Sequence, residues 1–164
     1  MNIKSFFREY SIVFLVYIVV AAVTVFIFKY ILMLNIIPSA SMENTIMTGD
    51  VVIASRWDRE TVNRYDVMVF VPEDEPDKYY IKRVIGMPGE TIVVDDGKVY
   101  ADGVELDDEF IAEAMNSSGD GTYKVPENCY FMMGDNRNES FDSRFWDSKY
   151  VPLENMTAKA RIII

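Results

Sequence analysis

The sequence predicts a mainly β domain that follows one N-terminal membrane-spanning helix. An uncharged, apolar stretch runs from Tyr10 to Phe28, and beyond Gly49 the apolar residues occur in short runs bounded by charged or turn residues. Such runs are typical of buried strands. A chain of 164 residues, half of them hydrophobic, is long enough for one ordinary core. The predicted parts are an N-terminal segment (1–10), a transmembrane helix (11–34) and one β domain (35–164).

The apolar stretch is long enough to cross a bilayer. The 23 residues from Ile12 to Leu34 would form a helix of about 34 Å, against a hydrocarbon core of about 30 Å. A cleaved signal peptide is the alternative, but its apolar region is only about 7–15 residues long. Lys4 and Arg8 precede the stretch, so the positive-inside rule predicts a single-pass cell-membrane protein with a cytoplasmic N-terminus and an extracytoplasmic domain.

The remaining chain alternates strand-like runs with turn signals. Residues 91–94 and 98–100 flank Asp95-Asp96-Gly97, a strong hairpin signal because glycine accepts the positive φ of a tight turn. Residues 113–122 are rich in Asn, Ser and Gly and predict an exposed loop. The expected strands cover residues 51–54, 67–70, 79–86, 91–94, 98–100, 104–106, 123–125, 129–133 and 160–164.

Composition excludes several kinds of chemistry. The chain has no histidine and one cysteine, which excludes a Ser-His-Asp triad, a histidine-ligated zinc site and an internal disulfide. Its net charge is −10, and residues 35–164 carry 13 basic and 25 acidic side chains without a basic stripe. This pattern argues against nucleic-acid binding.

The run Ile37-Pro38-Ser39-Ala40-Ser41-Met42 lies a few residues beyond the apolar stretch. Small hydroxyl residues on an exposed turn at this position suggest a serine nucleophile. Without histidine, the side chain that can be neutral near pH 7 and accept a serine proton is lysine, provided that its surroundings lower its pKa. Seven residues separate Leu34 from Ser41, so Ser41 lies within about 25 Å of the helix end and near substrates that leave the bilayer.

Strand alternation singles out Lys82. In the run that begins at Tyr80, Lys82 shares a face with Tyr80 and Val84, whereas Arg83 shares the other face with Ile81. A lysine among apolar and aromatic neighbours is costly unless it is neutral or paired. The alternative for this segment alone is two surface cations on an edge strand.

A third segment, from Met133 to Trp146, is rich in short polar residues. It suits a rigid loop with many side-chain to backbone hydrogen bonds, in which Arg137 and Arg144 are available to pair with Asp135 or Asp142. By itself the segment fits a metal or phosphate loop about as well as a catalytic scaffold.

Together these segments resemble bacterial type I signal peptidases over nearly the whole chain, and the single anchor and small size resemble the Gram-positive branch. The resemblance implies a signal-peptidase-like β domain. The motifs that carry it are Pro38-Ser39-Ala40-Ser41-Met42 with Thr45, Gly49-Asp50, the strand from Arg64 to Phe70, the run from Tyr80 to Gly89, and Gly134-Asp135-Asn136-Arg137 with Ser140, Asp142, Ser143 and Arg144.

The resemblance implies a membrane-anchored serine endopeptidase that cleaves signal peptides from exported preproteins, next to the secretion machinery, without a metal or cofactor. It makes Ser41 the nucleophile and Lys82 the general base, and the oxyanion would be bound by the Ser39 hydroxyl and the Ser41 backbone N–H. The remaining implied roles are orientation of Lys82 by Ser140, bracing of the loop by Asp142 and Arg144, and substrate pockets at Ile37, Met42, Ile46 and Tyr80, which as apolar residues also fit a core.

Three positions depart from the family pattern. Asn44 stands where the family usually has proline, Tyr65 where it usually has glycine, and Asp147 where glycine commonly follows the tryptophan. Asn44 affects the expected substrate preference more than the chemistry. Two alternatives remain: a noncatalytic anchored β domain that acts as a receptor or assembly factor, and a self-cleaving serine-lysine repressor-type protease. The latter needs a DNA-binding segment, which the sequence lacks.

Overall fold

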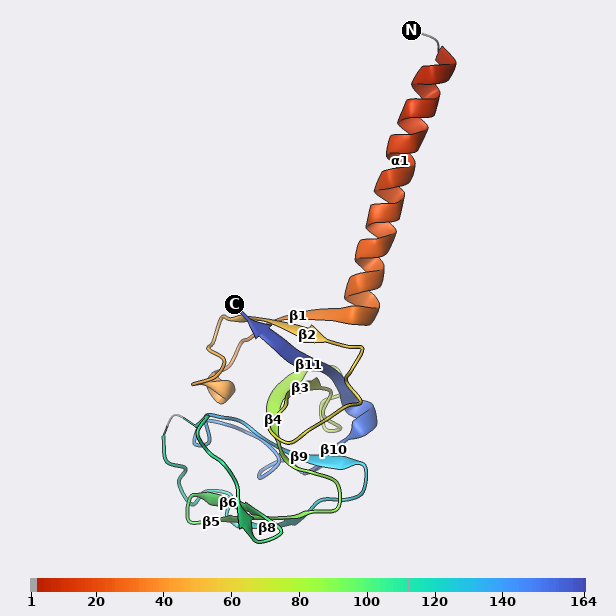
Figure 1. Ribbon diagram of the computed structural model, residues 1–164. Helices are drawn as coiled ribbons and strands as arrows, with labels where there is room; N and C mark the ends of the chain where they lie inside the picture. The colour runs from red at the N-terminus through yellow and green to blue at the C-terminus, as the bar shows by residue number, and fades with distance from the viewer. Residues whose placement is uncertain (1–2, 112) are drawn as a thin grey trace.

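A long N-terminal helix projects from a β domain in the computed structural model, which describes residues 3–111 and 113–164 (Figure 1). The α-helix α1 covers Ile3–Phe26 and continues as a π-helix, η1, over Ile27–Ile31. The 22 residues Tyr10–Ile31 are long and apolar enough to cross a membrane. Lys4 and Arg8, used above to predict the orientation, lie on α1 before Tyr10, outside the described side chains.

The helix ends earlier than the sequence predicts. Leu32–Ile36 form strand β1, which pairs antiparallel with β2, Val51–Ser55. The predicted boundary at Leu34 is therefore wrong by three residues, because apolar composition does not distinguish the end of a helix from a strand. The backbone of β1 is bonded to its neighbour from its first residue, opposite Ser55. Strand β1 begins at the residue after η1, so no linker separates the helix from the sheet.

The larger sheet has seven antiparallel strands in the order β1-β2-β11-β3-β4-β9-β10. Strand β11, at the C-terminus, lies between β2 and β3 and pairs with both, with a register shift in each pairing. The remaining strands of this sheet are β3 (Val67–Phe70), β4 (Tyr80–Gly86), β9 (Cys129–Met133), β10 (Val151–Pro152) and β11 (Met156–Ile163).

The smaller sheet lies at the end of the domain farthest from α1 (Figure 1) and has the order β7-β6-β5-β8. Its hairpin between β5 and β6 confirms the turn predicted from Asp95-Asp96-Gly97, with positive φ angles of 44° at Asp96 and 79° at Gly97. The strands are β5 (Thr91–Asp95), β6 (Lys98–Ala101), β7 (Val104–Glu105) and β8 (Gly121–Lys124).

All of the expected strands are present at least in part, and the strands that were not predicted pair with segments distant in the chain. Every run predicted as a strand contributes to one, although β8 begins inside the predicted 113–122 loop. Strands β1 and β10 and the first residues of β11 were not predicted. Two short 3-10 helices, η2 (Ala40–Met42) and η3 (Leu153–Asn155), complete the described elements.

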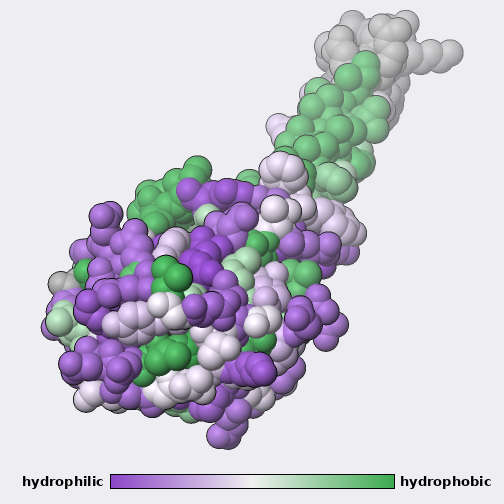
Figure 2. Space-filling model, turned by 60° about the horizontal axis from the view of Figure 1, so that its bottom comes forward, coloured by the Kyte–Doolittle hydropathy of each residue, from purple (hydrophilic) through white to green (hydrophobic). Residues whose placement is uncertain are grey.

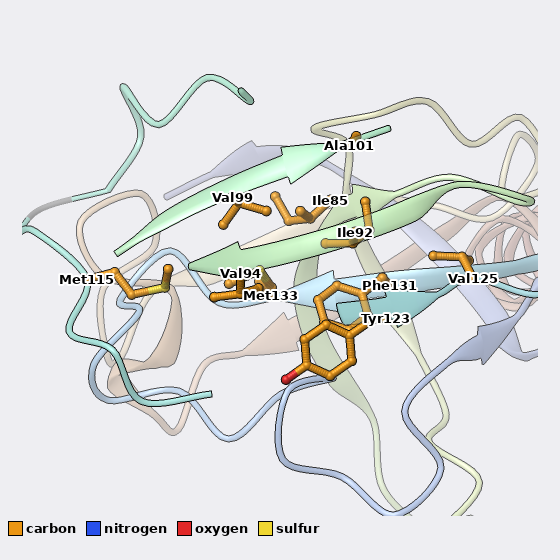
Figure 3. Close-up of a cluster of buried hydrophobic side chains, with 10 residues drawn as sticks. All are labelled: Ile85, Ile92, Val94, Val99, Ala101, Met115, Tyr123, Val125, Phe131 and Met133. Carbon is orange, nitrogen blue, oxygen red and sulfur yellow. The ribbon is translucent and has the colours of Figure 1, made fainter. Parts of the chain in front are cut away.

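Two apolar clusters lie on opposite faces of β4, as strand alternation requires. Ile85 joins Ile92, Phe131 and other side chains between the two sheets (Figure 3), where the Tyr123 and Phe131 ring centroids are 4.7 Å apart. Val84 joins a second cluster with Met68, Phe70, Met132 and Met156. On the face shown in Figure 2, the surface of the β domain is mostly hydrophilic, whereas the described part of the helix is apolar.

Candidate active site

Lys82 is buried on the Val84 face of β4. It lies opposite Met68 of β3 in the sheet register, and its side chain is only 5% exposed. The Lys82 Nζ is 2.5 Å from the Ser41 Oγ, a hydrogen bond between residues 41 positions apart in the chain. The Tyr80 ring centroid lies 6.0 Å from the same nitrogen. The face predicted by alternation is therefore the face observed, and it brings the lysine to the serine.

Burial lowers the pKa of Lys82 from 10.5 to about 8, because the ammonium form loses its hydration. The carboxylates of Asp142 and Asp135 oppose this shift, and the Arg144 guanidinium adds to it. With a pKa near 8, about one lysine in ten is neutral at pH 7, compared with fewer than one in a thousand at an ordinary pKa. The site thus supplies a lysine that can accept a proton near neutral pH.

Ser41 lies in η2 and is only 7% exposed, so the predicted exposed turn is in fact buried. Asn136 holds this turn through two hydrogen bonds: its backbone N–H donates to the Ser41 carbonyl and its Nδ2 to the Ala40 carbonyl, each at 3.2 Å. The sequence quoted Asn136 within a motif but gave it no role. Ser39 remains exposed, with its Oγ 3.4 Å from the Ser41 Oγ.

The loop after β9 closes the other side of the site. Asp142 accepts hydrogen bonds from the Gly134 N–H at 3.0 Å and from the Arg144 guanidinium at 2.8 and 2.9 Å, and both side chains of this ion pair are fully buried. Arg144 also donates to the Arg137 carbonyl at 2.7 Å. Asp142 thereby holds the first residue of the loop, and the pair stabilises the segment that carries Ser140.

Ser140 differs from the sequence-based expectation. Its Oγ is buried and has no hydrogen-bond partner among the described residues, so the expected bond to Lys82 is not formed here. A Cβ added to Gly134 would lie under 3.0 Å from both the Ser140 Oγ and the Ser41 carbonyl oxygen. Only glycine at this position lets the two serine segments approach so closely.

A second ion pair, between Arg83 and Asp135, lies on the opposite face of β4. Arg83 donates to Asp135 at 2.8 and 2.5 Å, and its Nη1 donates to the Tyr65 carbonyl at 2.9 Å. The Thr45 hydroxyl donates to Asp135 at 2.5 Å and accepts from Arg83 at 3.2 Å. Asp135 therefore pairs with Arg83 rather than with Arg137 or Arg144, and this network ties β4, the segment after η2 and the loop together.

Tyr65, one of the three departures, has a positive φ of 70°. A bulky residue is strained in this region of backbone space, whereas glycine is not. The Tyr65 ring packs on Phe110 with centroids 5.7 Å apart, and its hydroxyl accepts a hydrogen bond from the Asp107 N–H at 3.0 Å. These contacts offset part of the strain.

Ser41 and Lys82 line an open cleft of about 530 Å³. Tyr80 also lines the cleft. Ile37, Met42 and Ile46 instead pack with Val52 in a buried cluster and do not line it. The cleft is bordered by Pro38, Ser39, Ser41, Tyr80, Lys82 and Phe141, among others.

A mainly β domain that buries a lysine against a serine, behind one long apolar helix, has the arrangement of a membrane-associated serine-lysine peptidase. Comparison with known proteins agrees with this class. The chain belongs to the signal peptidase, peptidase S26, family, whose profile matches residues 8–164.

Individual relatives support the same family. The signal peptidase I of Leptolyngbya laminosa is 37% identical over 133 residues, covering 76% of this chain and 64% of that protein. Signal peptidase I V of Bacillus subtilis is 36% identical over 123 residues, covering 66% and 72%. A crystal structure of a signal peptidase I from Enterococcus faecalis, 29% identical, matches with a TM-score of 0.52 over 60% of this chain and 95% of that one. The chain spans about three fifths of the length of several curated relatives that it matches.

Proposed function

We propose that this protein is a membrane-anchored serine endopeptidase that cleaves signal peptides from exported preproteins. The observation that carries the proposal is the buried Lys82 Nζ at 2.5 Å from the Ser41 Oγ, beside an open cleft, in a chain of the signal peptidase family. The lowered pKa of this lysine gives the pair its chemistry. Among the described residues, Lys82 is the titratable group that forms a hydrogen bond with the Ser41 Oγ.

The proposed reaction is acyl transfer through Ser41. The Ser41 Oγ attacks the scissile carbonyl carbon while its proton passes to neutral Lys82, and the carbonyl oxygen becomes an oxyanion. The Ser39 hydroxyl and the Ser41 backbone N–H donate hydrogen bonds to that oxygen. When the carbon–nitrogen bond breaks, the Lys82 ammonium gives its proton to the leaving amine. Lys82 then takes a proton from water, which attacks the ester carbonyl carbon, and returns that proton to the Ser41 Oγ as the carbon–oxygen bond breaks and the acid product leaves.

The remaining residues hold this arrangement. Asp142 and Arg144 fix the loop behind Ser140, and we assign to Ser140 the orientation of Lys82 through a bond that forms when substrate is bound. Catalytic hydrogen bonds that are long or absent in a free enzyme often tighten in the complex. Ile37, Met42 and Ile46 would form the packed layer beneath the serine turn, and Tyr80 would contact the substrate.

The substrate would bind as an added strand in the cleft. Segments 38–39 and 79–81 both border the cleft, so the main chain of an extended peptide can pair with backbone groups while alternate side chains enter pockets. The position of the membrane helix favours a substrate that emerges from the bilayer. Helix η1 ends at Ile31 and β1 starts at the next residue, so the β domain begins directly at the end of the apolar helix. Ser41 follows only ten residues after Ile31.

Residues beyond Ile31 are proposed to lie outside the cytoplasmic membrane, next to the secretion machinery, with Lys4 and Arg8 inside. Protease added to intact spheroplasts should digest the β domain. Complete protection until the cells are lysed would reverse this topology.

The activity is tested with the full-length protein in detergent micelles and a purified test preprotein. Mass spectrometry should find one cut at the junction between the signal peptide and the mature chain. We expect the Ser41→Ala variant to keep the fold and to leave the preprotein intact. Equal cleavage by this variant would exclude Ser41 as the nucleophile.

A further inference from the structure

A second hollow lies next to the substrate cleft and shares two of its walls. It has a volume of about 150 Å³, and Tyr80 and Phe141 line both the hollow and the cleft. Phe145 and Trp146 complete an aromatic lining. The Tyr80 and Trp146 ring centroids are 5.9 Å apart, and Phe141 stacks on Phe145 at 6.3 Å with an interplanar angle of 13°. The hollow therefore presents aromatic rings at a place where a bound peptide would pass.

The rest of the lining is acidic. Asp74, Glu75 and Asp147 contribute carboxylates, and Pro72 is the remaining lining residue. Two lysines lie beside these groups: Lys78, which is 62% exposed, pairs with Glu75 at 2.5 Å, and Lys149 donates to the Trp146 carbonyl at 3.2 Å. Three carboxylates against two ammonium groups leave a net negative local charge. Aromatic faces and carboxylates both attract cations, so the two parts of the lining favour the same kind of ligand.

The hollow is held open by bonds between its two sides. Asp74 accepts hydrogen bonds from the Ser148 N–H at 3.1 Å and from the Ser148 hydroxyl at 2.9 Å, which ties the loop before β4 to the segment after Trp146. The Tyr80 hydroxyl donates to Glu75, and the Trp146 Nε1 donates to the Phe141 carbonyl at 3.2 Å. Because the polar atoms of both rings are already bonded, the ring faces are what remains for a ligand.

We propose that this hollow is a subsite for a lysine or arginine side chain of the preprotein substrate, close to the scissile bond. The inference rests on the proposed function, because it identifies the ligand as part of the peptide that Ser41 cuts. Tyr80 borders both spaces and its ring centroid is 6.0 Å from the Lys82 Nζ. Side chains on one face of an extended peptide repeat about every 7 Å, so the basic residue lies within about four positions of the cut.

The test is a set of preproteins that carry Lys, Ala, Leu or Glu at each of the four positions on either side of the cut. At one position, Lys should raise kcat/KM about tenfold over Ala, mainly through a lower KM, and Glu should lower it. Asp147→Lys should abolish the preference for Lys and improve cleavage of the Glu substrate. The matched control is Asp95→Lys, an equal change of charge at an exposed residue of β5, which should keep the preference.

Comparing Lys and Ala substrates within each variant cancels any general loss of activity. Equal cleavage of Lys and Ala substrates at all positions would overturn the subsite, as would a preference for Leu or an unchanged preference in Asp147→Lys. Calorimetric binding of the same peptides to Ser41→Ala measures the subsite without cleavage. Tighter binding of the Lys peptide together with no cleavage by the wild-type protein would refute the proposed function and leave the subsite standing.

Discussion

Replacing Lys82 with methionine removes a buried cation and the proposed general base in one change. Methionine has a similar length and no charge, so it fits the apolar neighbours of Lys82, among them Met68 and Val84. We expect the variant to be folded and inactive. Its stability relative to the wild-type protein should depend on pH, because only the wild-type protein carries the titrating group.

The magnitude follows from the lowered pKa of Lys82. The folded-state pKa of about 8 lies about 2.5 units below 10.5, and at about 1.4 kcal/mol per unit this corresponds to about 3 kcal/mol. Between these two values the unfolded chain binds a proton that the folded chain does not, so wild-type stability gains this amount as pH rises. Below about pH 8 both states are protonated. The advantage of the methionine variant should therefore fall by about 3 kcal/mol between pH 8 and 10.5.

Urea unfolding of the full-length protein in detergent micelles measures this difference at about pH 7.5, 9 and 10.5. The control is Lys124→Met, which removes an exposed lysine from β8 and should show a nearly constant difference. The fixed cost of losing the bond to Ser41 shifts every value equally and does not affect the slope. A free-energy difference for Lys82→Met that stays flat over this range would show that Lys82 titrates normally, and it would remove the basis for a neutral base.

Three further outcomes are expected. For the wild-type enzyme, kcat/KM should rise about tenfold per pH unit below pH 8 and level off above it, because neutral Lys82 is the active form. A pH profile that is flat from pH 6 to 9 would exclude Lys82 as the general base. Arg83→Lys should lose the forked contact with Asp135 and lower the free energy of unfolding by about 2 kcal/mol in urea titrations, and an unchanged midpoint would contradict the role of that pair. Gly134→Ala should reduce the rate of cleavage at least about 100-fold while the far-UV circular dichroism spectrum is retained, since the added Cβ displaces the Ser41 backbone. Near-normal turnover would mean that the segments carrying Ser41 and Ser140 can move apart freely.

Local patterns in the sequence predicted the features that depend on neighbouring residues. The apolar stretch predicted the helix, and Asp95-Asp96-Gly97 predicted the β5–β6 hairpin with its positive φ angles. Alternation along β4 predicted that Lys82 faces inward. Each of these follows from side-chain spacing along a single helix, turn or strand, which a sequence displays directly.

The sequence did not predict features that depend on partners distant in the chain. Leu32–Leu34 are as apolar as the helix before them, and only their pairing with β2 makes them a strand. Ser41 looked exposed because its own segment is short and polar, and Asn136, which holds the turn, is 95 residues away. The partner of Asp135 was equally hidden, since three arginines were available and the fold brings Arg83 to it.

The residue types at the site were therefore determined by the sequence, which contains no histidine and one inward-facing lysine on a predicted strand. The tertiary structure decided the 2.5 Å distance from Lys82 to Ser41 and the burial of both side chains. It also left the Ser140 hydroxyl without a hydrogen-bond partner among the residues that the structure describes. It also brought Tyr80 and Trp146 together in one hollow. The physical reason is that burial, and with it the pKa of the lysine, is produced by packing among segments that are far apart in the chain.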